Sequence, residues 1–432
     1  MQIDRATRHL DLDPRDPAFV QDPYPAYAAL QEATPVFFWR QYGHWCLAGH
    51  ADVSAALRDS RFGRQMSPVA SRATPGWPEP DPRLADFDRL ERHSLLELEP
   101  PDHTRLRGLV NRGFVSRRIA HLRPAIAQLS HRLIDGFERA GACDLIDPFA
   151  TQIPVLVIAG LLGVPDEHAG DLLAWSHDLV AMYQFRRSAE IEDRALTAAR
   201  AFSAFLRALV AARRAQPRDD LISALIAAEG ADDRLSEDEL ISTCVLILNA
   251  GHEATVHAIG NGVKALLEAG ADPAAAFATP EATRATIEEM LRFDPPLHLF
   301  TRYALEDMDW RGLALRRGDR IGLLLAAANR DPAVFAAPGR FHPARAANPH
   351  VSFGGGLHFC LGAPLARLEL DVALPILFQR LPGLRVAQPP VYSDSYHFRQ
   401  LQALELAWEH GLPGRLLCPI GEARGTASQD RA

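Results

Sequence analysis

The sequence has few cysteines, and no two of them lie close together. The 432 residues include only five, Cys46, Cys143, Cys244, Cys360 and Cys418. This odd number and wide spacing are unlike a disulfide framework, and the lack of a C-x-x-C pair argues against a zinc or iron–sulfur site. A cysteine that has a function in this chain therefore acts alone.

The chain also lacks an excess of positive charge and an apolar start. It has 46 Lys and Arg residues against 54 Asp and Glu, a formal net charge of −8. Nucleic-acid binding would then need a local basic patch. The segment Met1–Pro17 mixes charged residues with prolines, which predicts no secretory signal and no membrane anchor. We expect a cytoplasmic protein that binds neither nucleic acid nor a membrane.

What the sequence does contain is a large share of apolar residues in helical order. Hydrophobic residues make up 47% of the chain, enough for a large core. Three- and four-residue spacing predicts helices at His50–Asp59, Thr104–Phe114, Ile119–Ala140, Glu190–Arg214, Ser236–Ala269 and Thr279–Arg292. Short strands are predicted at Val36–Trp39, His44–Ala48, Phe300–Leu305, Arg320–Leu325 and within Ala387–Trp408. We expect one mainly α domain with a minor antiparallel β part over residues 1–420, and a frayed polar tail over 421–432.

Two irregular stretches, Arg61–Pro101 and Asn329–Gly356, interrupt the helical pattern. The first is rich in Pro, Ser, Arg and Asp, and the second contains several Pro and Gly residues. Loops of this length in a compact domain are usually functional. We therefore expect both stretches to border a functional site.

The segment Phe353-Gly-Gly-Gly-Leu-His-Phe-Cys360 ends in a cysteine just before a predicted helix that starts near Leu361. Its glycines permit a tight turn, and unsatisfied N–H groups at a helix start lower the pKa of a nearby thiol. Cys360 is therefore predicted to be a reactive thiolate. An ordinary buried cysteine is an equally open alternative. A phosphate loop is disfavoured, because no Lys-Ser/Thr follows and no strand clearly precedes.

A second segment, Glu289-Met-Leu-Arg292, places a carboxylate and a guanidinium on one face of a predicted helix. Such an i,i+3 pair is by itself most often an ordinary surface ion pair. Arg340 lies downstream in Phe335-Ala-Ala-Pro-Gly-Arg-Phe341. It would complete a buried Glu289–Arg292–Arg340 network of charge-assisted hydrogen bonds.

Five motifs follow one another along the chain: Glu99-Pro-Pro-Asp-His103-Thr-Arg-Leu-Arg107, Ala250-Gly-His-Glu253, Glu289-x-x-Arg292, Pro338-x-Arg-Phe341 and Phe353-Gly-x-Gly-x-His-x-Cys360-x-Gly362-x-x-Leu365-Ala-Arg367. In this order and spacing they resemble the bacterial cytochrome P-450 family of haem-thiolate monooxygenases. The resemblance extends from about Asp22 to Trp408, nearly the whole chain.

This resemblance implies a single-domain, prism-shaped P-450 fold that uses haem b and O2. The haem would be buried between a long central helix and the cysteine loop, with Cys360 as the axial iron ligand. Amides of the loop would hydrogen-bond the sulfur. The haem-binding positions of the family correspond to His103, Arg107, Ala250, Gly251, Arg302, Phe353, Gly354, His358 and Gly362. On residue type alone, the charged ones would be read as solvated surface residues.

The central helix departs from the family pattern Ala-Gly-x-Asp/Glu-Thr, in which the acid and the hydroxyl relay protons. The chain keeps the acid as Glu253, but Ala254 occupies the threonine position and Thr255 follows it. One residue along a helix is a rotation of about 100°, so the hydroxyl of Thr255 points elsewhere unless the helix is unwound. We hypothesise that protons pass through Glu253 and ordered water, assisted by an oxygen of the substrate. Alternatively, Ala254 only packs against the haem.

The same helix contains His252-Glu253-x-x-x-His257, which superficially resembles a zinc-protease motif. Zinc ligation of that class needs histidines at i and i+4, whereas a spacing of five leaves the second ring about 140° from the first. We interpret both histidines as hydrogen-bonding residues of the helix.

Nothing in the chain resembles a flavin domain or an iron–sulfur pattern, so the resemblance implies a separate ferredoxin-type electron donor with its NAD(P)H reductase. Six arginines and no acid lie between Thr104 and Arg123. This region borders the cysteine side of the haem in the family, so Arg112, Arg117 and Arg118 are predicted to dock an acidic ferredoxin. A generic solvated basic face is the alternative. We expect the protein to be a monomer.

By resemblance, the substrate walls include Met182, Tyr183, Leu248, Ala250, Leu297, His298 and Phe398. Most of these residues are apolar, which predicts a small-to-medium hydrophobic substrate, with His298, Tyr183 or His397 orienting one polar group. Each of them could instead be plain core packing.

The predicted reaction is hydroxylation or epoxidation with O2. A peroxide-driven haem-thiolate enzyme, a non-catalytic haem sensor or carrier, and a thiol hydrolase are the alternatives.

Overall fold

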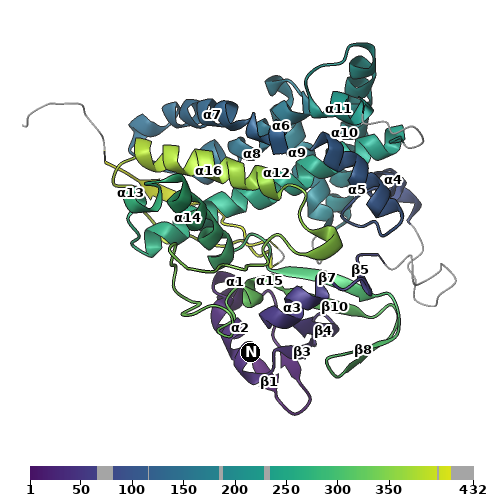
Figure 1. Ribbon diagram of the computed structural model, residues 1–432, viewed down its shortest axis with the longest axis vertical. Coiled ribbons are helices and arrows are strands. Elements are labelled where there is room, and N and C mark those ends of the chain that lie inside the picture. Colours follow the sequence, from purple (N-terminus) through teal and green to yellow (C-terminus); the bar gives the residue numbers. More distant parts are fainter. Residues whose placement is uncertain (66–80, 115, 184–187, 228–233, 397, 410–432) are drawn as a thin grey trace, which may run out of the picture.

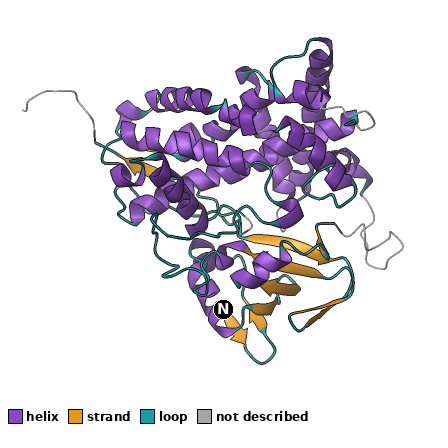
Figure 2. Ribbon diagram, viewed as in Figure 1, coloured by secondary structure: helices purple, strands orange, loops and turns teal. Residues whose placement is uncertain are grey.

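The computed structural model shows a layer of helices above a smaller part built on a sheet (Figures 1 and 2). The structure describes residues 1–432 apart from 66–80, 115, 184–187, 228–233, 397 and 410–432. The predicted tail over 421–432 and His397 lie outside the described residues.

The helices are α1 (Pro17–Gln21), α2 (Tyr24–Ala33), α3 (His50–Ala56), α4 (Ala85–Glu91), α5 (Asp102–Gly113), α6 (Ser116–Ala120), α7 (Arg123–Asp135), α8 (Gln152–Leu162), α9 (Ala169–Val180), α10 (Ala189–Ala215), α11 (Leu221–Ala227), α12 (Glu237–Glu268), α13 (Pro273–Ala276), α14 (Pro280–Phe293), α15 (Leu325–Ala328) and α16 (Ala363–Arg380). The strands are β1 (Gln2–Asp4), β2 (His9–Asp11), β3 (Val36–Trp39), β4 (His44–Leu47), β5 (Phe62–Gly63), β6 (Ala142–Asp144), β7 (Leu299–Ala304), β8 (Met308–Trp310), β9 (Leu313–Leu315), β10 (Arg320–Leu324), β11 (Arg385–Val386) and β12 (Glu405–Ala407).

The main sheet is mixed rather than antiparallel. Its strand order is β1-β2-β3-β4-β10-β7-β5. The pairs β2–β3 and β4–β10 are parallel, so the predicted antiparallel arrangement is wrong for them. Strand β10 joins β4 through a long connection, which no local turn signal could have indicated. Smaller antiparallel sheets are formed by β11-β12-β6 and by β8-β9.

The long helix α12 runs through the helical layer and contacts α8, α9, α14 and α16. It begins at a capping box in which the Ser236 side chain accepts from the Glu239 N–H and the Glu239 carboxylate accepts from the Ser236 N–H. Its bounds agree with the predicted helix Ser236–Ala269 to within one residue at each end. Apolar side chains surround most of it, as expected for a helix inside the core.

Three local predictions need correction. The segment Ile119–Ala140 was predicted as one helix, but α6 ends at Ala120 and α7 begins at Arg123, where Pro124 occupies the first turn. Helix α4 lies inside the stretch predicted to be irregular. Helix α8 was not predicted, because it is apolar on nearly every face and has no 3.6-residue alternation.

By length and composition, α10 is the one helix of the described chain that could cross a membrane. Core helices of other proteins pass the same test. Here α10 packs against α4, α9 and α12, and its Arg213 forms a buried ion pair with Asp220. These contacts account for its apolar face as part of the core.

Candidate functional site

The segment from Phe353 to Cys360 forms a tight loop ahead of α16. The Cys360 N–H donates to the Phe353 carbonyl over 3.0 Å. Gly354 and Gly356 have φ of 70° and 64°, a conformation that favours glycine. A Cβ on Gly356 would lie 2.5 Å from the carbonyl oxygen of Leu57. Glycine is therefore required where this loop rests on the end of α3.

The thiol of Cys360 lies at the start of α16, which is capped by Gly362. The side chain keeps some exposed surface, but the surrounding protein removes most of its water, and this desolvation raises its pKa. Backbone N–H groups of Gly362 and Ala363, with Arg107 and Arg367, act in the opposite direction. The predicted lowering of the thiol pKa is therefore wrong for the protein alone. A coordinated metal ion deprotonates a thiol outright.

Polar side chains of α5, β7 and the cysteine loop form a second group, which includes His103, Arg302 and His358. His103 is fully buried, and neither ring nitrogen has a hydrogen-bond partner among the described residues. Its ring lies 4.5 Å from that of His358, whose Nε2 lies 3.3 Å from Oε1 of Glu99. Arg302 is almost fully buried, and desolvation lowers its pKa to about 9. This group combines buried donors with few protein acceptors.

Arg107 of α5 contacts the cysteine loop directly. Its Nη2 donates to the carbonyl of Phe359 over 2.6 Å. The contact ties α5 to the residue that precedes Cys360. Arg107 therefore positions the cysteine loop, in addition to placing its charge near the sulfur.

The central helix α12 is unbroken through the predicted proton-relay segment. Ala250 and Ala254 share one face by their four-residue spacing. Thr255 is 3% exposed and lies about 100° around the helix from Ala254. No local unwinding brings its hydroxyl onto that face. A Cβ on Gly251 would lie 2.7 Å from Cδ1 of Ile158, so glycine allows α8 to approach α12 closely.

Glu253 lies beside three histidines. Its Oε1 is 3.3 Å from Nε2 of His177 on α9 and 3.9 Å from Nδ1 of His252, and its Oε2 is 3.3 Å from Nε2 of His257. Burial raises the pKa of Glu253, but His257 and the other two rings outweigh it and hold the pKa below its usual value. The carboxylate is therefore ionised at neutral pH and lies on the α9 side of the helix.

The predicted Glu289–Arg292 pair is fully buried. Arg292 donates from Nε and Nη2 to the two oxygens of Glu289, each over 2.7 Å. Arg340 was predicted to supply the third charge, but its side chain is exposed and only its carbonyl accepts from Arg292. Arg345 takes that place, with Nε 3.3 Å from Oε2 of Glu289. The prediction was wrong on this residue because the loop backbone turns Arg340 outward.

A neighbouring ion pair was missed by sequence reasoning. Glu288 accepts from Nε and Nη2 of Arg367 over 2.6 and 2.8 Å, and lies 2.9 Å from Nε2 of His350. Although burial opposes ionisation, these partners lower the pKa of Glu288 to about 2. Arg367 also lies over the ring of Phe353, 4.4 Å from its centre. The sequence offered one indication of this pair, because Arg367 is the last residue of the cysteine motif.

Comparison with known proteins agrees with this geometry. A family model described as Cytochrome P450 matches residues 278–384. The "Biotin biosynthesis cytochrome P450" of Bacillus subtilis (strain 168) is 34% identical over 395 residues, covering 90% of this chain and 97% of that protein. This chain belongs to the cytochrome P450 family. The "6-deoxyerythronolide B hydroxylase" of Saccharopolyspora erythraea is 38% identical over 374 residues, covering 85% of this chain and 90% of that P450.

Solved P450 structures confirm the predicted fold. The crystal structure of P450BioI in complex with hexadec-9Z-enoic acid ligated acyl carrier protein has a TM-score of 0.83 at 34% identity, covering 91% of this chain and 100% of that chain. The protein is therefore a P450 monooxygenase with a single-domain P450 fold. P450 enzymes use haem b and O2, bind small substrates and take electrons from redox partners.

The residues present fit a haem. Haem b carries two propionate carboxylates. The ring nitrogens of His103, which lies next to His358 and has no partner among the described residues, and the buried guanidinium of Arg302 offer the donors that such groups need. Cys360 offers a sulfur near two backbone N–H groups. His103, His358, Arg302 and Cys360 therefore have the chemistry that a haem site needs.

The predicted substrate residues do not all lie in one environment. Leu248 and Met182 are buried, and the Tyr183 hydroxyl donates to Glu91 over 2.8 Å. Leu297 and Phe398 pair as an antiparallel bridge. His298 is buried, with Nδ1 2.9 Å from the Tyr27 hydroxyl, and so belongs to a polar core cluster. Because Nδ1 of His298 is engaged by Tyr27, only its Nε2 could contact a substrate.

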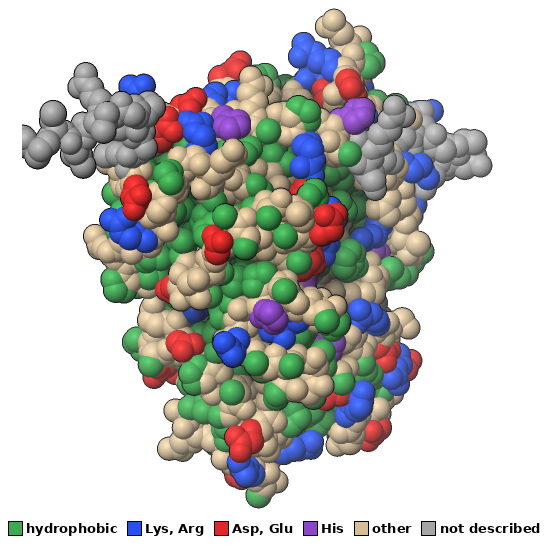
Figure 3. Space-filling view, turned by 60° about the vertical axis from the view of Figure 1, so that its left-hand side comes forward, with side chains coloured by type: hydrophobic (Ala, Val, Ile, Leu, Met, Phe, Trp, Pro, Cys, Tyr) green, Lys and Arg blue, Asp and Glu red, His purple; other side chains and the backbone are tan. Residues whose placement is uncertain are grey.

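The predicted docking arginines are also in different surroundings. Arg112 is exposed on α5. Arg118 lies 3.5 Å from Asp219, and the side chain of Arg117 lies outside the description. Within the same run, Arg105 pairs with Glu239 and Arg123 with Asp371. On the face in Figure 3, acidic and basic side chains are interspersed.

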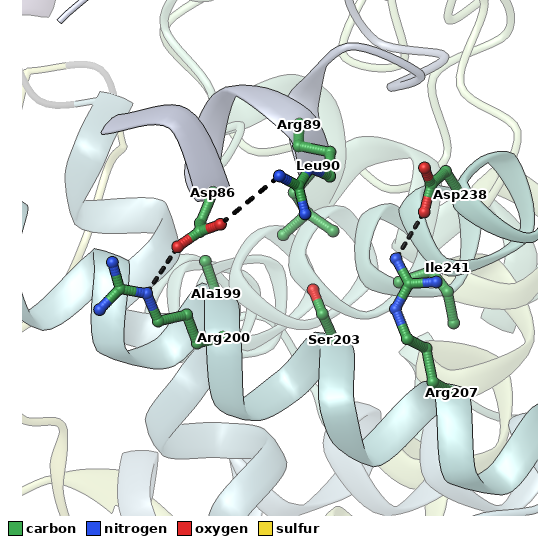
Figure 4. A pocket seen from close by; sticks show the side chains of 9 residues that line it. All are labelled: Asp86, Arg89, Leu90, Ala199, Arg200, Ser203, Arg207, Asp238 and Ile241. Atoms are coloured by element: carbon green, nitrogen blue, oxygen red, sulfur yellow. Dashed lines mark hydrogen bonds and ion pairs between the residues drawn. The ribbon is translucent and has the colours of Figure 1, made fainter. Parts of the chain in front are cut away.

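A small cavity lies between α4, α10 and α12, away from the cysteine loop (Figure 4). Its volume is about 50 Å³. Asp86 pairs with Arg200 and Arg89, and Arg207 pairs with Asp238. Because these charges satisfy one another, the cavity is a junction between helices, and none of the predicted site residues lines it.

Proposed function

We propose that this P450 inserts one oxygen atom of O2 into a small-to-medium hydrophobic substrate, by hydroxylation or epoxidation, and that the Cys360 sulfur would hold the haem iron. The observation that carries the proposal is the Cys360 thiol, held by a glycine turn at the start of α16 and flanked by Arg107 and Arg367. When bound, haem supplies the oxygen-activating chemistry. His103, His358 and Arg302 would hold its propionates. The enzyme acts as a monomer in the cytoplasm.

The carbonyl complex of the reduced, haem-loaded protein tests this proposal. A Soret band of the thiolate-ligated type supports ligation by a cysteine, and substitution of Cys360 identifies which one. A band of the histidine-ligated type under gentle conditions would contradict the proposal. A screen of hydrophobic compounds for a shift of haem spin state, followed by product analysis, identifies the substrate class.

We infer a proton route from the side chains that α12 carries at this point. Ala254 has no hydroxyl on the face it shares with Ala250, and Thr255 lies on another face. The Glu253 carboxylate is ionised and lies towards His177. Protons are therefore carried by Glu253 and ordered water, with an oxygen of the substrate in place of the missing hydroxyl.

The Ala254→Thr variant tests this route. For substrates without an oxygen near the reacting carbon, we expect product formed per NAD(P)H oxidised to rise about twofold or more, because the new hydroxyl orders the proton-donating water. For oxygenated substrates we expect little change. Ala254→Val is the matched control, since valine has the shape of threonine without its hydroxyl. Coupling that is unchanged by threonine with every substrate, or raised equally by valine, would contradict the route.

We also propose that the electron donor is a ferredoxin served by an NAD(P)H reductase, and that it docks near Arg112. Arg112 is exposed on the helix whose Arg107 contacts the cysteine loop, so a partner there would lie near the thiolate side of the haem.

Reversing this charge, in Arg112→Glu, is expected to slow reduction by an acidic ferredoxin about 3- to 10-fold at low salt and to flatten its dependence on salt. Stopped-flow reduction measures both effects. Arg5→Glu, an exposed change in the sheet part of the molecule, is the control. Equal kinetics for native protein and Arg112→Glu would refute the docking site.

A further inference from the structure

A cluster of metal-ligating side chains lies between α9 and α12. His177 comes from α9, and His252 and Glu253 are neighbours on α12. One ligand atom from each of the three residues lies within 4.8 Å of the other two. The separation of His177 Nε2 from Glu253 Oε1 is 3.3 Å, and that of His252 Nδ1 from the same oxygen is 3.9 Å. The cluster has two imidazoles and one carboxylate.

A second observation points to a ligand at this cluster. The His252 side chain is 1% exposed, and neither of its ring nitrogens has a hydrogen-bond partner within the described part of the chain. A buried imidazole without a partner has lost its hydrogen bonds to water, and no protein hydrogen bond compensates for that cost in free energy. Its Nδ1 faces Glu253, and its ring lies 5.2 Å from that of His177. A cation among these three groups would satisfy it.

The surroundings of the carboxylate also suit a bound cation. His257 lies 3.3 Å from Oε2 of Glu253, on the side away from His177 and His252. It can orient the carboxylate as an outer-shell partner and leaves Oε1 free to coordinate. The His177 side chain is 52% exposed. That exposure provides an entry path from solvent and lets the ring move.

We propose that His177, His252 and Glu253 form a binding site for one divalent transition-metal ion, of which Zn²⁺ fits best. Two imidazoles and a carboxylate are a common Zn²⁺ ligand set, with water in the fourth position. With ligand bonds of about 2 Å, tetrahedral geometry places ligand atoms about 3.3 Å apart. Nε2 of His177 already has that spacing from Oε1 of Glu253, at 3.3 Å, and Nδ1 of His252 lies slightly farther from the same oxygen, at 3.9 Å. The two histidines of this site, His177 and His252, come from different helices, whereas the zinc-protease-like motif would use His252 and His257 of α12 alone.

This inference goes beyond the proposed monooxygenase reaction. Metal binding does not require catalysis, but it has a consequence for it. A bound Zn²⁺ holds the carboxylate that we propose carries protons. Zn²⁺ therefore acts as a reversible inhibitor without displacing the haem or its sulfur ligand.

Isothermal titration of the haem-loaded, metal-free protein with ZnCl₂ tests the site. We expect one Zn²⁺ per protein at the tightest site. His177→Ala should weaken this binding at least about 10-fold, and His177→Cys should restore it, because a thiolate is also a Zn²⁺ ligand. His121→Ala, which removes another exposed histidine, is the control. The carbonyl spectrum checks that each variant keeps its haem site.

Two results would overturn the site: no binding at millimolar Zn²⁺, or binding that His177→Ala and His121→Ala alter equally. The same titration followed by product formation separates this inference from the proposed proton route. Inhibition that needs at least about 10-fold more Zn²⁺ in His177→Ala supports both. Binding of one Zn²⁺ at His177 without inhibition supports the site and contradicts the role of Glu253.

Discussion

Replacing Cys360 with serine is expected to abolish the thiolate-type carbonyl spectrum and to lower product formation at least about 100-fold, a rise of about 2.7 kcal/mol in the activation barrier. With haem bound, the thiolate would supply the electron density on which oxygen activation by this family depends. A serine oxygen is smaller and less polarisable, and it holds its proton more strongly. The loop itself should persist, because its turn depends on Gly354 and Gly356 and on the Cys360 N–H, which serine keeps.

Cys143→Ser is the matched control for this experiment. Cys143 is also partly exposed and unpaired, but it lies on β6, in the small sheet with β12. Its substitution should leave the spectrum and the rate unchanged. Haem content and far-ultraviolet circular dichroism show whether each variant is folded. A thiolate-type spectrum that survives in Cys360→Ser and disappears in Cys143→Ser would show that Cys143 is the ligand, and it would refute the proposal.

Replacing Glu289 with alanine is expected to destabilise the protein by about 3–5 kcal/mol, because it leaves the buried Arg292 charge without its partner. Arg292 has no exposed surface. Its other acceptors are the carbonyls of Asn329, Pro338 and Arg340, which carry no full charge. The lost carboxylate also accepts from the His342 N–H over 2.7 Å. The segment leading to the cysteine loop therefore loses one of its contacts with α14 and keeps the His350–Glu288 contact.

The same helix supplies the control. Glu281→Ala removes the carboxylate of the Glu281–Arg284 pair, which has the same i,i+3 spacing and the same 2.7 Å separation but is exposed on both sides. Its urea midpoint should equal that of the native protein, since exposed pairs contribute little. Urea unfolding followed by circular dichroism and by haem absorbance measures both variants. Equal midpoints for Glu289→Ala and Glu281→Ala would show that burial of the pair has no energetic weight.

Much of the cysteine side of this site was readable from the sequence. Gly354 and Gly356 indicated a turn because only glycine adopts positive φ easily, and the structure has that turn. The 32 residues of α12 were visible because their apolar side chains recur every three or four positions. Such signals are local: they depend on residues a few positions apart along one backbone.

The partners of the charged residues could not be read in this way. Arg345 rather than Arg340 reaches Glu289, because an irregular loop decides which side chain points inward. The start of a helix predicted a lowered pKa for the Cys360 thiol, but the pKa is raised, because desolvation depends on all the protein packed around the sulfur.

The two faces of α12 show the same division. That Ala254 replaces threonine, and that Thr255 lies about 100° away, follows from the sequence and the helical repeat. That His177 of α9 meets His252 and Glu253 was decided only by the packing of two helices distant in sequence. Helical periodicity determines which face a residue occupies, and tertiary packing determines what that face meets.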